Sequence, residues 1–297
     1  MDSLLGIDWG TSNRRAYLLG ADGACLRRHE DDQGMLAVGG NFAGSLAALR
    51  ARLDVDAAVP VVMSGMVGSA SGWQEAPYLD LGVPLTDLPA RLVPVEGHAG
   101  CFIVPGYCAR EGDIDVMRGE ETQLLGALGL AGVGSVDSVD GALVLPGTHS
   151  KWVTLRGARV ARLATYMTGE LFAMLAAGGT LAALMAPGTH NEGDDDSAFK
   201  AGLAEARRQQ PLTHALFGVR ARVVSGAMPA AQARSFVSGL LIGAEFAAEA
   251  TGAITIIGSP ALGARYAGAA AQFSLAARVL DPDQVYLTAL SHFIGKV

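Results

Sequence analysis

The chain has 297 residues, of which 50% are hydrophobic and 17% charged, and 22 Lys and Arg against 29 Asp and Glu give a net charge of −7. This composition excludes a disordered or fibrous chain, and the acidic balance argues against a nucleic-acid partner, which would need clustered cations. At about 100–200 residues per domain, the length predicts two domains with a cleft between them, a common place for an active site.

Three strands separated by two tight turns are predicted at the start of the chain. Leu4–Asp8 and Arg15–Leu19 are strand-like segments on either side of a short turn, and Ala24–Arg27 follows a second turn. Residues 45–53 have a helical pattern, and the β-branched run Val59–Met63 then predicts a strand that leads into a glycine-rich segment. This order of elements is typical of an α/β domain.

A second strand, Gly-Thr turn and strand is predicted in the middle of the chain. Residues 142–145 and 152–155 flank this turn, and a third strand is predicted over residues 159–166. Gly-Thr turns can recur by chance in a chain with 39 glycines. Because both of these turns lie between strands, we interpret them as the sign of a duplicated domain.

The remaining segments predict mainly helices. Residues 113–130 change from a polar loop to a helix with two glutamates in its first turn. The uncharged stretch 171–189 is broken by glycines and a proline, so we expect a buried helix, a turn and a short helix rather than a membrane span. A buried strand over 253–257, a helix over 261–271 and an amphipathic helix over 285–294 complete the chain.

Two features of the whole chain favour the cytoplasm. Its three cysteines are an odd number without the spacing of a metal site, which indicates free thiols in a reducing compartment. The N-terminus carries an acid where a secretory signal carries a base, so we expect no export signal. We also expect no membrane partner, and the sequence leaves the oligomeric state open, with a homo-oligomer among the options.

The chemistry-bearing motif nearest the N-terminus follows the first strand. The P-loop, the dinucleotide fingerprint, the nucleophile elbow and the H-E-x-x-H motif are all missing from the sequence. The first strand instead ends in Asp8, and a turn with Gly10, two hydroxyl side chains and Asn13 follows. Backbone amides and hydroxyls in such a turn can bind phosphates, and an acid at the strand end can hold hydrated Mg²⁺. The second Gly-Thr turn offers similar donors, so two facing turns can clamp one triphosphate.

Six longer strings occur in order within residues 4–263: IDWGTSNRRAYLL, VVMSGMVGSASGWQEAPYL, DVMRGEETQLLGAL, LPGTHSKWV, YMTGELF and SGLLIGAE. Together they resemble the 2-dehydro-3-deoxygalactonokinase family of the acetate and sugar kinase/actin ATPase superfamily. The resemblance implies an α/β fold of two ribonuclease-H-like domains, each a mixed sheet flanked by helices, with an inter-domain cleft. It implies a sugar-acid and phosphate-binding domain at residues 1–110 and a nucleotide-binding domain at 111–297, whose last helix can pack back on the first domain.

The activity that the resemblance implies is a step of galactonate breakdown. The γ-phosphoryl group of ATP would be transferred to the 6-hydroxyl of 2-dehydro-3-deoxy-D-galactonate, with Mg²⁺ accompanying the ATP and Asp8 anchoring the metal. The residues implied for the first phosphate turn are Gly10, Thr11, Ser12, Asn13 and Arg15. Those implied for the second turn are Gly147, Thr148 and His149, and those implied near the adenosine are Gly258 and Ser259.

The general base is implied by the position of a glycine. Sugar kinases place a carboxylate just after a glycine at the head of a helix, usually as Gly-Asp, and Gly119-Glu120 stands at that place. Consecutive helical residues point about 100° apart, so only one of Glu120 and Glu121 can face the cleft squarely. The preceding glycine favours Glu120 as the base and leaves Glu121 as a capping or structural residue.

The segment after the strand over 59–63 offers groups for the sugar acid. The candidates are Met66, Gly68, Trp73, Glu75 and Tyr78. Both aromatic residues have an equally good interpretation as core or rim side chains. A substrate carboxylate needs a cation, and Arg118 and Lys151 are the basic residues within apolar motifs, although either can instead cap a helix or neutralise a phosphate. His149 lacks partners at ligand spacing, which favours a hydrogen-bonding loop residue over a metal ligand.

Two other functions fit parts of the sequence. A kinase of another keto sugar acid or of a polyol would use the same phosphate turns, and only the substrate segment separates the two. A nonenzymatic ATP-binding regulator is the third option, because fold alone does not fix function. Such regulators usually add a DNA-binding or peptide-binding domain, which we do not expect before a first strand at Leu4 in a chain without a basic arm.

Overall fold

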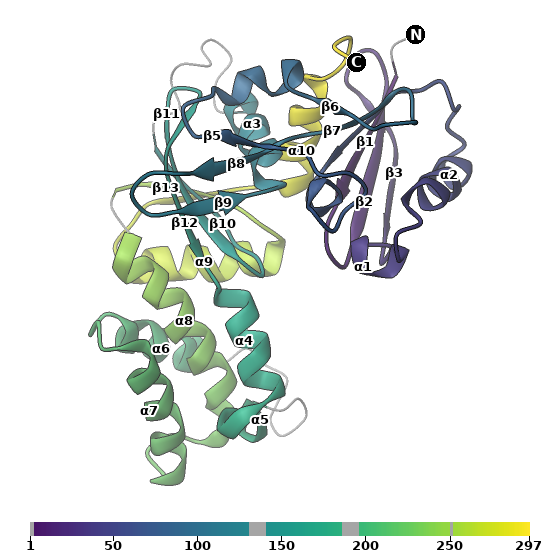
Figure 1. The fold of residues 1–297 in the computed structure, drawn as a ribbon. Helices are drawn as coiled ribbons and strands as arrows, with labels where there is room; N and C mark the ends of the chain where they lie inside the picture. The colour runs from purple at the N-terminus through teal and green to yellow at the C-terminus, as the bar shows by residue number, and fades with distance from the viewer. Residues whose placement is uncertain (1–2, 131–140, 186–195, 250–251) are drawn as a thin grey trace. The chain divides into compact units, whose positions relative to one another are not determined.

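The computed structural model describes residues 3–130, 141–185, 196–249 and 252–297, and Figure 1 traces the helices and strands along them. The chain divides into two compact units, the first formed by Met1–Asp140, Val153–Leu163 and Leu280–Val297 and the second by Gly141–Trp152 and Ala164–Val279. The first compact unit extends past residue 110, where we predict the boundary between the two domains. It also includes the last helix of the chain.

A mixed sheet organises the first unit, with the strand order β3-β2-β1-β4-β7-β6. Its strands are β1 (Leu4–Trp9), β2 (Arg14–Leu19), β3 (Cys25–Asp31), β4 (Val61–Ser64), β6 (Val93–Pro94) and β7 (Cys101–Ile103). Strand β1 is antiparallel to β2 and parallel to β4, which is in turn parallel to β7. The carboxyl ends of β1 and β4 therefore reach the same edge of the sheet, where α/β proteins commonly bind ligands.

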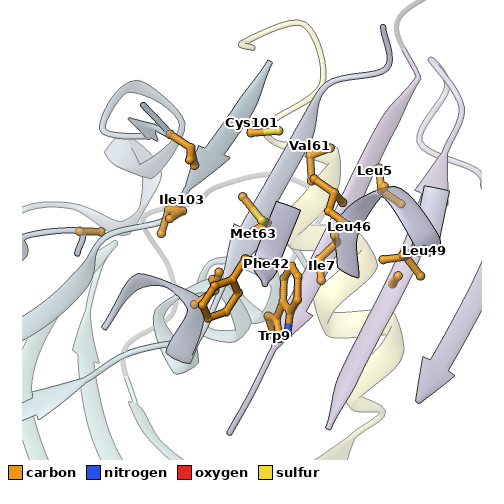
Figure 2. Close-up of a cluster of buried hydrophobic side chains, with 14 of the residues drawn as sticks. Leu5, Ile7, Trp9, Phe42, Leu46, Leu49, Val61, Met63, Cys101 and Ile103 are labelled. Atoms are coloured by element: carbon orange, nitrogen blue, oxygen red, sulfur yellow. The ribbon is translucent and has the colours of Figure 1, made fainter. Parts of the chain in front are cut away.

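The hydrophobic core on one face of this sheet combines a strand period with a helix period. Figure 2 shows alternate residues of β1, from Leu5 to Trp9, beside residues of α2 (Phe42–Leu53) that recur at helical spacing. Trp9 is fully buried and makes an edge-on contact with Phe42, with ring centroids 5.5 Å apart. Each large apolar side chain buried in this way contributes about 1.5–3 kcal/mol. The short helix α1 (Met35–Val38) precedes α2.

Two helices and a small sheet complete the first unit. The helix α10 (Pro282–Ser291) packs against α3 (Glu120–Leu130), and Tyr17 of β2 donates a hydrogen bond of 2.6 Å to Asp283 at the start of α10. The small sheet has the order β5-β8-β9, formed by β5 (Tyr78–Asp80), β8 (Gly106–Ala109) and β9 (Asp115–Met117). Because β9 ends three residues before α3 begins, this sheet fixes the approach to Glu120.

A second mixed sheet repeats the topology of the first, with the order β12-β11-β10-β13-β14. Its strands are β10 (Gly141–Leu145), β11 (Ser150–Arg156), β12 (Arg159–Tyr166), β13 (Ile254–Ile257) and β14 (Ala277–Leu280). In both sheets the first four strands lie in the order third, second, first, fourth, and the first is parallel to the fourth. The two sheets, each with its helices, confirm the predicted fold class and support the duplication indicated by the two Gly-Thr turns.

Helices make up most of the second unit. They are α4 (Thr168–Ala177), α5 (Gly179–Met185), α6 (Asp196–Ala206), α7 (Leu212–Val224), α8 (Ala233–Glu249) and α9 (Pro260–Gln272), and α6 packs along α8 (Figure 1). Short 3-10 turns occur in the chain at Met66–Gly68, Leu85–Ala90 and Ala230–Gln232.

The predicted break in the stretch 171–189 occurs between α4 and α5, but the prediction of a buried helix is wrong. No residue of α4 is buried, and its apolar residues are only partly buried where they pack on the core of the second unit. Residues 186–189 lie outside the described part of the chain. Among the described helices, none alone is long and apolar enough to cross a membrane. The pair α4 and α5 meets that length and composition only jointly, with a bend of 83°.

Candidate active site

Asp8 lies at the carboxyl end of β1, where it faces a cation. In the β1–β2 hairpin, Asp8 lies directly opposite Arg15, and Arg15 Nη2 lies 2.6 Å from Asp8 Oδ2. The Asp8 side chain is 20% exposed. Burial raises the pKa of Asp8, whereas the charge and hydrogen bond of Arg15 oppose this shift. The strand end therefore presents a partly accessible carboxyl group that is balanced by one guanidinium.

The turn after β1 is held by its backbone and leaves its side chains accessible. The amide of Gly10 donates to the carbonyl of Asn13 at 3.0 Å, and amides from the start of α1 donate to three carbonyls of the turn at 2.9–3.3 Å. The side chains of Thr11, Ser12 and Asn13 are exposed. A rigid turn with accessible hydroxyl and amide groups is suited to binding phosphate oxygens.

Two glycines bring the start of α3 against the end of β4. Gly65 has φ of +90° and Gly119 has φ of +111°, and a Cβ added to Gly119 would lie only 3.2 Å from the Cα of Gly65. A Cβ added to Gly65 would lie 2.9 Å from the carbonyl oxygen of Trp9, at the end of β1. Glycine is therefore required at both positions. As a consequence, Glu120 begins its helix beside the ends of β1 and β4.

The two glutamates at the head of α3 differ in burial. Glu120 Oε2 accepts a hydrogen bond of 3.0 Å from the amide of Arg118, and Glu121 Oε2 accepts one of 2.7 Å from the amide of Gly119. Glu120 is half-buried, whereas Glu121 is completely buried. Burial and the neighbouring charge of Glu120 raise the pKa of Glu121 to about 8, so Glu121 is predominantly neutral at pH 7. Glu120 is thus the carboxylate that a ligand can reach.

Some residues of the predicted substrate segment lie together and others do not. The guanidinium of Arg118 stacks on the Tyr78 ring, 4.2 Å from its centroid, and lies against Gly68. Trp73 instead stacks on Phe42, with centroids 6.1 Å apart, as part of the core of the unit.

The last two predicted substrate residues, Met66 and Glu75, lie on the connection that follows β4. Met66 begins the 3-10 turn and is half-buried, and Glu75 is exposed.

The second Gly-Thr turn, between β10 and β11, is positioned by α4. The amide of Glu170 donates to the carbonyl of Thr148 at 3.0 Å, and the Glu170 carboxylate lies 2.5 Å from His149 Nε2. Thr148 and His149 are exposed, and Gly147 is half-buried and lines a pocket. The turn therefore has the same combination of fixed backbone and accessible side chains as the first one.

The end of β13 lies beside this turn because β13 is parallel to β10. A Cβ added to Gly258 would lie 3.3 Å from Pro146 Cδ, and Ser259 caps α9 by accepting a hydrogen bond from the amide of Leu262. Lys151, the other predicted cation, is buried, and its Nζ donates to Thr165 Oγ1 at 2.8 Å. Lys151 belongs to the second compact unit, whereas Arg118 and Glu120 belong to the first.

A buried carboxyl group, Glu245 of α8, is a feature that the sequence analysis missed. Its Oε2 accepts hydrogen bonds from Ser150 Oγ at 2.8 Å and Trp152 Nε1 at 2.7 Å, and its Oε1 accepts from Tyr266 at 2.7 Å and from Thr168. Burial raises the pKa of Glu245, and these hydrogen bonds oppose the shift. The partners are 21 to 95 residues away along the chain, so no local pattern indicates this cluster.

A pocket of about 190 Å³ adjoins the Glu245 cluster within the second unit. Thr168 and Tyr266 line it together with Gly147, Phe172, Arg234 and Arg265. Aromatic and cationic walls are suited to a nucleoside with attached phosphates. A larger hollow of about 720 Å³ in the first unit lies beside Arg14 and α2, and neither Asp8 nor Glu120 lines it.

A divalent cation such as Mg²⁺ would need oxygen ligands from carboxylates, phosphates or water. In the described ranges, His, Cys, Asp and Glu nowhere form a group of three that could hold a metal ion. Mg²⁺ keeps several waters and is commonly held by one or two carboxylates together with substrate phosphates. Asp8 therefore fits as the single protein ligand of a Mg²⁺ ion that phosphates and water also hold. The described residues do not fit a metal ion held by protein side chains alone.

Comparisons with known proteins agree on one family. The 2-keto-3-deoxy-galactonokinase family matches residues 8–293. The chain is 38% identical to the 2-dehydro-3-deoxygalactonokinase of Escherichia coli (strain K12), over 88% of this chain and 87% of that protein. It is 36% identical to a Rhizobium meliloti (strain 1021) protein named "Probable 2-dehydro-3-deoxygalactonokinase DgoK1", over 96% and 94% of the two chains.

Solved structures support the same fold. A Sinorhizobium meliloti protein assigned to 2-dehydro-3-deoxygalactonokinase superposes with a TM-score of 0.87 at 35% identity, covering 97% of this chain and 94% of that one. The activator of the 2-hydroxyisocaproyl-CoA dehydratase from Clostridium difficile superposes with a TM-score of 0.51 at 11% identity, over 98% and 94% of the two chains. The second likeness concerns the fold alone.

Proposed function

The chain belongs to the 2-keto-3-deoxy-galactonokinase family, and on that premise we propose that it transfers the γ-phosphoryl group of ATP to the 6-hydroxyl of 2-dehydro-3-deoxy-D-galactonate. The observation that carries the proposal is the position of Glu120. This accessible carboxylate begins its helix where Gly119 meets Gly65, at the ends of β4 and of β1, the strand that carries Asp8. The proposed base and the proposed phosphate-binding turn thus lie at the same edge of one sheet.

Glu120 is proposed as the general base. Phosphoryl transfer depends mainly on positioning and charge neutralisation, but the attacking alcohol must lose its proton. A carboxylate hydrogen-bonded to the 6-hydroxyl both orients the oxygen and accepts that proton. The amide of Arg118 holds Glu120 Oε2 at 3.0 Å, which restricts the side chain before the substrate arrives.

The role of binding phosphates is assigned to exposed groups of the two Gly-Thr turns. Thr11, Ser12 and Asn13 would donate hydrogen bonds to phosphate oxygens, and Thr148 and His149 would do the same from the second turn. Gly258 and Ser259 are proposed near the adenosine. The same pocket that Gly147 lines is the proposed place of the nucleoside.

Asp8 would hold Mg²⁺ when the metal is bound, which would neutralise charge that develops on the phosphates. Arg15 is already paired with Asp8, so it is placed to contribute a second cation at the same strand end. We also propose that the protein acts in the cytoplasm, which its three free thiols support.

An assay of ADP release over a panel of acceptors tests the function. We expect turnover that depends on ATP and Mg²⁺ with 2-dehydro-3-deoxy-D-galactonate. With glycerol and neutral sugars, which leave the carboxylate-binding cation unpaired, kcat/KM should be lower by about 100-fold or more. Equal turnover of glucose or xylulose would contradict the sugar-acid assignment and favour a kinase of another keto sugar or polyol.

A further inference from the structure

Arg118 carries a buried hydrogen-bond donor without an acceptor. In the described ranges, its Nη1 is the only buried side-chain nitrogen or oxygen atom that has no hydrogen-bond partner. Buried polar atoms are almost always paired, and an unpaired donor on a charged group is destabilising. An unsatisfied donor of this kind beside a proposed active site indicates that a ligand atom completes it.

The rest of the guanidinium is fixed in place. Nη2 donates to the carbonyl of Ala76 at 2.7 Å, Nε donates to the Tyr78 hydroxyl at 3.4 Å, and the Tyr78 ring stacks on the guanidinium at 4.2 Å. On the other side, a Cβ added to Gly68 would lie 3.0 Å from Nη1, so the turn leaves just enough space for this nitrogen. The orientation of the fork is therefore set before a ligand binds, which lowers the entropic cost of binding.

The charge of Arg118 is not matched within its own hydrogen bonds. The two groups that accept hydrogen bonds from its side chain, the Ala76 carbonyl and the Tyr78 hydroxyl, are both neutral. The nearby Glu121 is also predominantly neutral at pH 7. An anionic ligand is therefore favoured over a neutral one. A carboxylate is a suitable anion, because a charge-assisted hydrogen bond between a guanidinium and a carboxylate is shorter and stronger than one between neutral groups.

Arg118 also connects this donor to the proposed base. Its backbone amide donates to Glu120 Oε2 at 3.0 Å, so the anion-binding side chain and the base side chain are held by the same short loop of the same unit. Lys151, the other candidate cation, already donates to Thr165 and belongs to the second unit. The geometry thus separates two residues that the sequence leaves as equal candidates.

We propose that Arg118 binds the carboxylate of the sugar acid through Nη1 and thereby sets the preference of the enzyme for acids over neutral sugars. The proposal rests on the proposed kinase function and adds the residue that reads the substrate's charge. Arg118 is half-buried as a whole, and Nη1 is the buried nitrogen of its guanidinium that has no hydrogen-bond acceptor.

The test compares the sugar acid with its carboxamide, in which a neutral amide replaces the carboxylate. Arg118→Met should lower kcat/KM for 2-dehydro-3-deoxy-D-galactonate on the order of 100-fold, mainly through KM, and leave kcat/KM for the carboxamide and KM for ATP nearly unchanged. Arg118→Lys should restore only part of the loss, because an ammonium group cannot reach Ala76 and the carboxylate in the forked geometry.

Arg110→Met is the matched control. Arg110 is an exposed arginine that donates to Asp80 at 2.8 Å and to the carbonyl of Tyr78, beside the same small sheet, and its loss should leave the acid-to-amide ratio as in the wild type. An unchanged ratio in both Arg118 variants, or an equal loss in Arg110→Met, overturns the proposal.

Calorimetric titration of the acid and of the carboxamide, without ATP, keeps the proposal separate from the kinase function. A wild-type protein that binds the acid more tightly than the amide but does not phosphorylate it refutes the kinase function alone. Equal binding of both by the wild type refutes the role of Arg118 even if turnover is observed. Arg118→Lys serves where Arg118→Met does not fold, as judged by circular dichroism.

Discussion

The carboxyl group of Glu121 accepts a hydrogen bond of 2.7 Å from the backbone amide of Gly119. This bond fixes the glycine that lies against Gly65, and it does so from a side chain that is completely buried and predominantly neutral. The neighbouring Glu120 therefore remains as the half-buried carboxylate at the head of the helix. Two consecutive glutamates thus have different environments, from which different roles follow.

Replacement of each glutamate by glutamine should separate these roles. Glu120→Gln should retain binding of ATP and of the sugar acid but lose roughly 10²–10⁴-fold in kcat, the usual contribution of a positioned base. The effect of Glu121→Gln should be mainly on stability or affinity and not on kcat. The side-chain amide oxygen can still accept a hydrogen bond from the Gly119 amide. Steady-state kinetics and calorimetric binding measure both variants. Near-normal kcat in Glu120→Gln together with inactive Glu121→Gln would assign the base to Glu121.

The stability of the protein should depend on the protonation of Glu121. The pKa of Glu121 is about 8 in the folded state against an ordinary value of 4.5, so the folded state binds more protons between these two values. The contribution of Glu121 to stability is therefore present at low pH and is lost as the pH rises toward 8. Urea unfolding between pH 5 and pH 8.5 should show that Glu121→Gln loses less stability over this range than the wild type. Parallel pH profiles for the two proteins would show that Glu121 does not have a raised pKa.

Asp8 should be more important for Mg·ATP than for the sugar acid. Asn is nearly isosteric and can still accept a hydrogen bond from Arg15, so Asp8→Asn should fold, raise KM for Mg·ATP and shift the Mg²⁺ dependence of turnover to higher concentrations. Binding of the sugar acid should change little. Asp113→Asn, in an exposed loop, is the control. A large loss of sugar-acid affinity with an unchanged Mg²⁺ dependence would place Asp8 in the sugar site.

Glu245 should position the walls of the pocket in the second unit. Glu245→Leu leaves the buried Trp152 Nε1–H without an acceptor, which should cost about 1–3 kcal/mol of stability, and it releases Thr168 and Tyr266, which line the pocket. We expect KM for ATP to rise while KM for the sugar acid remains close to that of the wild type.

Glu245→Gln is the conservative partner of that variant. It should recover most of both properties, because one amide oxygen still accepts from Trp152 and the hydroxyls of Thr168 and Tyr266 can accept from the amide nitrogen. Thermal unfolding and ATP kinetics of the two variants measure this difference. If Glu245→Leu is less stable but has unchanged KM values for both substrates, the cluster has no role in binding.

The sequence predicts best those parts of the fold that depend on local patterns. The first strand is predicted at Leu4–Asp8 and observed at Leu4–Trp9, because a run of apolar residues ends in a glycine turn. The strands of the small sheet contain three or four residues each and are stabilised by pairing with distant segments, so the sequence analysis does not identify them.

In the candidate site too, short motifs can be predicted from the sequence and contacts between distant residues cannot. The Gly-Thr turns and Gly119-Glu120 are visible as short motifs, and the structure places them at strand ends and at a helix start. The contacts of Arg118 with Ala76 and Tyr78 join residues 42 and 40 positions apart, and the partners of Glu245 are more distant still. Long-range contacts of this kind depend on the packing of several elements, which no single segment of the sequence specifies.

The most direct test of the proposed function is the identification of the product by phosphorus NMR and mass spectrometry. The wild-type protein is incubated with Mg²⁺, one equivalent of ATP and 2-dehydro-3-deoxy-D-galactonate. We predict one equivalent of ADP and a sugar acid that carries a single phosphate on its 6-hydroxyl, with none formed by Glu120→Gln on the same time scale. Release of ADP and inorganic phosphate with the sugar acid unmodified, or a phosphate on another hydroxyl, would contradict the proposed reaction.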